Sequence, residues 1–108
     1  MTDAVKNELD RIVNTLVNTG IVTKIILFGS YAKGEERPNS DIDLCVLTQV
    51  SDKHPLDVTI DLRVKLIKVR ESPLDLFAYN QDAFWRQAGR QTSFEREIAE
   101  TGVVLYGQ

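Results

Sequence analysis

The sequence predicts an α/β fold in which a small mixed sheet of three to four strands is flanked by helices. Short apolar runs with strand character alternate with segments of helical spacing along the 108 residues, as expected for strands joined by helical crossovers. Strands are predicted at 22–28, 41–44, 72–79 and 103–106, and helices between residues 3 and 20 and at 31–33, 55–69, 81–88 and 94–100. The length indicates a single domain, 1–108.

The outer elements follow from simple periodicities. In the first segment Val5, Leu9, Ile12 and Leu16 recur at helical spacing, which predicts an amphipathic helix. Residues 25–28 form a continuous apolar run, and the segment 22–28 is predicted to be a buried strand. The strand predicted at 72–79 begins near a proline, a position where a strand tolerates a missing N–H.

The segment 55–69 is ambiguous. Its apolar residues alternate with polar ones, which is a strand signal by periodicity. A helix is nevertheless expected, because a crossover is needed to bring Asp75 of the strand at 72–79 beside Asp41 and Asp43. Whether 55–69 forms a helix or a strand is therefore a direct test of the predicted topology.

Two short motifs indicate the chemistry. Gly29-Ser30 follows the first strand, and after ten residues come Asp41 and Asp43. A glycine at a strand end allows close approach of a phosphate, and carboxylates two residues apart leave one face of a strand. Carboxylate and phosphate oxygens are the ligands that Mg²⁺ prefers. The pattern predicts a site for a nucleoside triphosphate and divalent metal.

These residues resemble the motif of the minimal nucleotidyltransferases in the DNA polymerase beta nucleotidyltransferase superfamily. The string GSYAKGEERPNSDIDL is similar to theirs over most of its length, and the segment 93–106 is similar to their C-terminal part. The family carries a third carboxylate on a later strand, and Asp75 fits that position. The resemblance covers nearly the whole chain and implies a polymerase-beta-like nucleotidyltransferase core.

The resemblance also implies a mechanism and site residues. Two Mg²⁺ ions would be held by Asp41, Asp43 and Asp75, and Asp75 could take the proton of the acceptor hydroxyl. The nucleotide, ATP as donor of AMP, would be bound by Gly29, Ser30, Lys33 and Ser40. Many relatives carry arginine after Gly-Ser, whereas this chain has Tyr31, so Lys33 is expected to supply the phosphate contact.

Small proteins of this family often accompany a HEPN-domain protein, and the pair resembles a toxin-antitoxin system in which AMP is added to a tyrosine of the toxin. This antitoxin role is the leading functional prediction. Two alternatives are a small-molecule nucleotidyltransferase and a noncatalytic antitoxin that neutralises its partner by binding. The small size indicates that the acceptor arrives on a partner protein or that the chain assembles with itself.

Composition excludes other classes of partner. The net charge of −3 provides no basic field for direct binding of nucleic acid. Arg63, Lys65, Lys68 and Arg70 are interpreted as a solvated helix face. The sequence shows neither a membrane span nor a signal peptide, and with a single cysteine the chain is expected to be cytoplasmic.

Individual residues elsewhere are predicted to have structural roles. Cys45 is expected to be a small buried residue, and Phe84 and Trp85 are expected to pack and not to stack on bases. His54, which has no histidine or cysteine nearby in the sequence, is expected to be a solvated loop residue.

Overall fold

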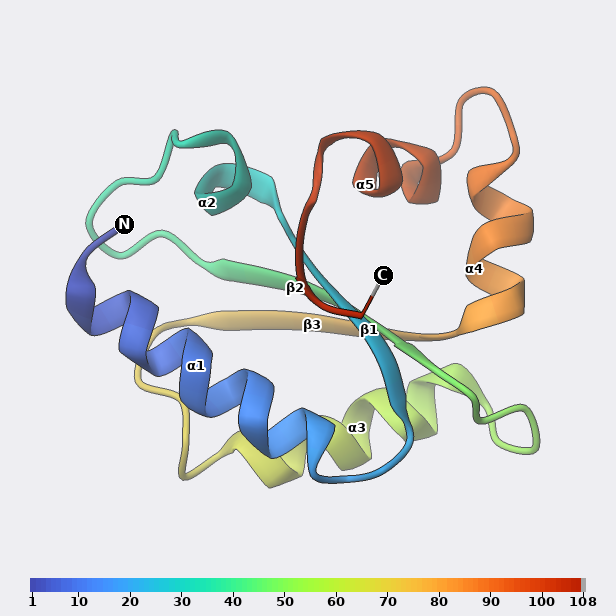
Figure 1. The fold of residues 1–108 in the computed structure, drawn as a ribbon, viewed down its shortest axis with the longest axis horizontal. Helices are drawn as coiled ribbons and strands as arrows, with labels where there is room; N and C mark the ends of the chain where they lie inside the picture. Colours follow the sequence, from blue (N-terminus) through green and yellow to red (C-terminus); the bar gives the residue numbers. More distant parts are fainter. Residues whose placement is uncertain (108) are drawn as a thin grey trace.

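The computed structural model describes residues 1–107, and its elements alternate as the sequence predicted (Figure 1). In chain order they are α1 (Asp3–Val17), β1 (Val22–Phe28), α2 (Gly29–Lys33), β2 (Ile42–Thr48), α3 (Pro55–Leu66), β3 (Leu74–Asn80), α4 (Gln81–Ala88), α5 (Phe94–Thr101) and β4 (Val103–Tyr106). The predicted boundaries shift by a few residues. The short helix begins at Gly29 instead of Tyr31, and the third strand begins at Leu74 instead of Ser72.

The sheet is mixed and has four strands in the order β3-β2-β1-β4. The pairs β1–β2 and β1–β4 are antiparallel, whereas β2–β3 is parallel. The parallel pair requires a crossover, which α3 provides. Strand β4 lies at one edge, as predicted, and β3 lies at the other.

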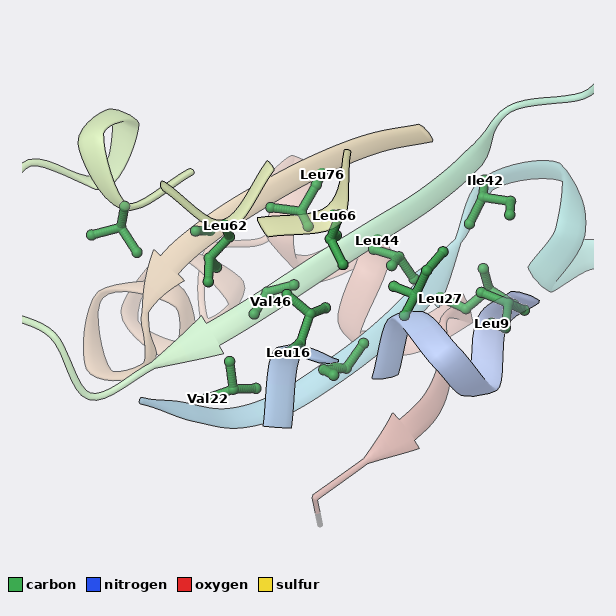
Figure 2. Close-up of a cluster of buried hydrophobic side chains, with 14 residues drawn as sticks. Leu9, Leu16, Val22, Leu27, Ile42, Leu44, Val46, Leu62, Leu66 and Leu76 are labelled. Carbon is green, nitrogen blue, oxygen red and sulfur yellow. The ribbon is translucent and has the colours of Figure 1, made fainter. Parts of the chain in front are cut away.

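Helices cover both faces of the sheet. Helices α1 and α3 lie on one face, and α4 and α5 lie on the other (Figure 1). The short helix α2 follows β1 directly, and its Tyr31 and Ala32 pack against the core beneath α1 and α3. The larger core lies between the sheet and α1 and α3, and Figure 2 shows its side chains converging from these helices and from β1, β2 and β3. Its buried members are Leu9, Ile12, Leu16, Val22, Ile25, Leu27, Ile42, Leu44, Val46, Val58, Leu62, Leu66, Leu76 and Ala78.

The opposite face of the sheet carries a smaller core of Ile26, Cys45, Leu47, Phe84 and Ile98. Cys45 and Phe84 are fully buried there, which confirms their predicted packing roles. Trp85 contacts Phe84 edge to face, with ring centroids 5.0 Å apart, but remains 46% exposed. The packing prediction therefore holds for Trp85 only in part.

The ambiguous segment forms a helix, as expected from the topology. Pro55 occupies its first turn, where a missing N–H has no cost, and the exposed His54 caps it by accepting a hydrogen bond from the Leu56 N–H at 3.1 Å. The capping role of His54 was not predicted. The helix ends at Leu66, short of residue 69.

The strand-like alternation in α3 has a physical explanation. The helix is apolar on two faces: Val58, Leu62 and Leu66 enter the core, whereas Leu56, Ile60 and Val64 point outward and are 50–59% exposed. Residues two apart in sequence fall on opposite sides of a helix, so two apolar faces produce a period of two. Within residues 1–107, no helix is long and apolar enough to span a membrane.

Candidate active site

The three predicted carboxylates lie at the same end of the parallel strand pair, although within residues 1–107 they do not form a preassembled set of three metal ligands. Asp43 of β2 lies directly opposite Asp75 of β3. Asp41 immediately precedes β2, two residues before Asp43, so strand alternation directs both carboxylates away from the core formed by Ile42 and Leu44. The crossover through α3 therefore aligns residues from distant parts of the chain.

The electrostatics of Asp43 reflect this arrangement. The pKa of its carboxyl is raised, first by partial burial and then by the negative charges of Asp75 and Asp41. Like charges close together disfavour ionisation. The neighbouring carboxylates are therefore suited to a cation, because a divalent ion would remove this repulsion and carboxylate oxygens are hard ligands.

Gly29 is fixed in place by its contact with Asp43. It has φ +73°, a left-handed conformation that favours glycine. A Cβ added there would overlap Oδ2 of Asp43 and lie 3.0 Å from its Cγ. The turn after β1 thus presses its backbone against the central carboxylate, and only glycine fits both the conformation and the space.

Beyond Gly29, the helix α2 carries Ser30 and Lys33. A cavity of about 210 Å³ lies between α2 and α5, and Gly29, Lys33, Phe28, Phe94 and Glu97 contribute to its wall. The Lys33 ammonium lies 3.8 Å from the Glu97 carboxylate, with both side chains largely exposed. Two of the predicted nucleotide-binding residues therefore line one cavity beside Asp43.

Ser40 is placed beside the carboxylates but is engaged in a turn. Its Oγ accepts a hydrogen bond from the Arg37 N–H at 2.7 Å, and its own N–H donates to the Arg37 carbonyl at 3.0 Å. Between them Asn39 adopts φ 71°, which asparagine tolerates better than most residues. These contacts shape the loop that delivers Asp41.

Asp75 has a cationic neighbour that the sequence did not reveal. The Arg63 guanidinium of α3 lies 3.9 Å from the Asp75 carboxylate, and its Nη2 donates to the Leu76 carbonyl at 3.4 Å. The sequence analysis assigned Arg63 to a solvated helix face, but the structure gives it these two contacts with β3. Within residues 1–107, histidine, cysteine, aspartate and glutamate side chains form no preassembled cluster of three metal ligands.

Some residues of the site could not be found from sequence motifs. Arg63 and Glu97 each lie in a different element from the residue that they contact, Asp75 of β3 and Lys33 of α2. The rings of Phe28, Phe77 and Phe94 cluster beside the carboxylates, although none belongs to a motif. No motif marks Arg63 in the sequence, because its contact depends on how α3 packs beside β3.

Comparison with known proteins defines the class. The family model described as "Polymerase beta, Nucleotidyltransferase" matches residues 10–108. A protein of Methanocaldococcus jannaschii described as a "Putative protein adenylyltransferase" is 36% identical over 87 residues, which cover 81% of each chain. The chain therefore belongs to the polymerase beta nucleotidyltransferase family and is a nucleotidyltransferase, as the resemblance predicted.

Solved structures agree with this assignment. A chain from a toxin-antitoxin crystal structure with AMP-PNP superimposes with a TM-score of 0.61 and 26% identity, over 94% of this chain and 74% of that chain. A chain from a mutant of the toxin-antitoxin MntA-HpeT gives a TM-score of 0.58 and 22% identity, over 92% of this chain and 72% of that chain. The fold therefore matches that of chains found in toxin-antitoxin structures.

Proposed function

We propose that this nucleotidyltransferase transfers AMP from ATP to a tyrosine hydroxyl of a HEPN-domain toxin and thereby acts as its antitoxin in the cytoplasm. The observation that carries the chemistry is the alignment of Asp43 with Asp75, next to Asp41 and in contact with Gly29. Carboxylates beside a phosphate-binding backbone would repel the phosphate unless cations lay between them.

The chain offers residues for the triphosphate of the donor and for its metal ions. Gly29 and Ser30 lie where the β- or γ-phosphate would be held, and Lys33 can leave its exposed partner Glu97 to contact the triphosphate. Ser40 contributes by shaping the turn before Asp41. Asp41, Asp43 and Asp75 would hold two Mg²⁺ ions, which supply charge neutralisation on the triphosphate and acidify the acceptor hydroxyl.

Asp75 is assigned the proton transfer. Its carboxylate is half exposed at the end of an edge strand, so an acceptor can approach it from solvent. Arg63 at 3.9 Å provides a positive charge that orients the carboxylate. Attack of the acceptor oxygen on the α-phosphorus forms the new P–O bond while pyrophosphate leaves, and Asp75 accepts the proton of the hydroxyl.

The choice of acceptor rests on the relatives. The 36% identical relative is described as a protein adenylyltransferase, and the 26% identical structure is a toxin-antitoxin with AMP-PNP. A protein acceptor fits the exposed edge position of Asp75. The HEPN identity and the tyrosine follow from the family resemblance alone and are the parts that the experiment must decide.

The direct test incubates the chain with a HEPN-domain protein encoded beside it, ATP and Mg²⁺, followed by intact-mass spectrometry and peptide mapping. We expect the partner to gain one AMP moiety on tyrosine. Asp43→Asn should abolish the gain, and Asp75→Asn should bind Mg-ATP but transfer slowly, because the amide keeps the shape and loses the base. Stable association without modification would instead favour neutralisation by binding, and modification of a small alcohol without partner would favour the small-molecule enzyme.

A further inference from the structure

Three phenyl rings form a cluster on the carboxylate-bearing face of the sheet. Phe28 ends β1, Phe77 lies in β3 and Phe94 begins α5. Their ring centroids are 5.7–6.3 Å apart, and Phe94 meets both others edge to face. This phenyl cluster unites residues that are far apart in the sequence.

The phenyl cluster is more exposed than packing requires. Phe77 is 43% exposed and Phe94 is 47% exposed, whereas the aromatic ring that completes the nearby core, Phe84, is fully buried. Exposed apolar surface rimmed by polar groups is a feature of ligand-binding grooves. The polar rim here consists of the aspartates on one side and the Lys33–Glu97 pair on the other.

The position of the phenyl cluster relative to the carboxylates is fixed by strand register. Phe28 is paired with Asp43, which is paired with Asp75, so these residues form one row across three strands. Phe77 lies two residues beyond Asp75 on the same face, about 6.6 Å along the strand. Phe28 and Phe94 also line the cavity of about 210 Å³ that reaches Gly29.

We propose that the phenyl cluster is the subsite for the purine base of the donor nucleotide. The inference rests on the proposed function, which places the triphosphate at Gly29 and the carboxylates. A ligand that fills both parts of the site must carry its negative charge at the end near Gly29 and the carboxylates. At the other end, near the phenyl cluster, it must present a flat apolar face. Every base has such a face, and aromatic side chains stack on it favourably.

The test separates the base from the phosphates by using two probes. Calorimetry would measure the affinities of Mg-ATP and of Mg-tripolyphosphate, which lacks base and sugar, for the wild-type chain and for Phe77→Ala and Phe94→Ala. Each variant should weaken Mg-ATP binding about tenfold, within the range typical of lost base stacking. Tripolyphosphate affinity should not change, because the phosphate contacts are intact.

Trp85→Ala is the matched control, because Trp85 is an aromatic residue of similar exposure, 46%, outside the phenyl cluster. It should alter neither affinity. Phe77→Leu retains apolar volume but not the π face, so it should weaken Mg-ATP binding even if the alanine variant is unstable; melting temperatures would be measured alongside.

Unchanged Mg-ATP affinity in folded Phe77 and Phe94 variants would overturn the base subsite, and so would equal losses for both probes. A slower transfer to the partner protein with unaltered Mg-ATP affinity would assign the cluster to partner docking instead. Conversely, phenylalanine-dependent Mg-ATP binding without any transfer of AMP would retain the subsite and refute the proposed reaction.

Discussion

Replacement of Gly29 by alanine tests the contact at the centre of the site. Alanine at φ +73° costs about 1–2 kcal/mol. The added Cβ also overlaps the Asp43 carboxylate, and forcing that side chain about 30° away from its rotamer costs about 0.5–1.5 kcal/mol more. The expected destabilisation is therefore roughly 1.5–3.5 kcal/mol, which for a domain of this size lowers the melting temperature by at least several degrees.

Gly20→Ala provides the matched control. Gly20 has a similar φ of +79°, but a Cβ there meets nothing within 4 Å. Gly20→Ala should lose only the stability associated with the strained backbone conformation, about 1–2 kcal/mol, and should retain nucleotidyl transfer. Gly29→Ala should in addition lose transfer about 100-fold, because a displacement of 1 Å in a reacting group has effects of that size.

Calorimetric melting and a single-turnover transfer assay on both variants would provide these numbers. Wild-type transfer by Gly29→Ala would refute the proposed coupling between the turn and Asp43. An equal loss of transfer in Gly20→Ala would show that general destabilisation, and not the local overlap, controls the rate.

Three further predictions concern titratable groups. Because the pKa of Asp43 is raised, its ionisation lowers stability as pH rises through the folded pKa. Asp43→Asn should therefore have a higher melting temperature than wild type at neutral pH and the same melting temperature in acid. Thermal melts across the pH range would check this. Burial raises the pKa of Glu8, but hydrogen bonds from Ser72 and Glu71 lower it overall. Glu8→Gln should therefore reduce the stability of the folded state by about 1.5–3 kcal/mol at pH values above the pKa of Glu8 in the unfolded chain. This loss of stability should become smaller as the pH falls below that pKa. Burial raises the pKa of the Cys45 thiol to about 12, so a thiol reagent at pH 8 should modify it only as fast as the protein unfolds.

The sequence was sufficient for the elements whose function depends on local spacing. Period-two alternation placed Asp41 and Asp43 opposite Ile42 and Leu44, because the geometry of a strand leaves no alternative. Gly29 was predicted as a close-approach residue, and the structure shows that the close neighbour is Asp43 itself. The family resemblance supplied Asp75, and the strand register aligns it with Asp43.

The remaining features depend on tertiary packing and could not be found locally. The alternation in α3 resembled a strand because the helix is apolar on two faces, which a one-dimensional pattern cannot separate. The Arg63–Asp75 contact and the clustering of Phe77 with Phe94 arise only when separate elements meet. Each of these residues is ordinary in its own segment.

The connectivity of the sheet links activity to completion of folding. Glu8 in the first helix accepts hydrogen bonds from Ser72, 64 residues later, and the strand nearest the end of the chain pairs with β1. Such contacts between distant parts of the chain make folding slow, because the chain between them must close into a loop before they form. A nascent chain that has passed Asp43 but not Asp75 therefore lacks part of the candidate site, and under the proposed function it could not use ATP before β3 has formed. Recovery of transfer during refolding should then follow the final, global step and not the first appearance of helix.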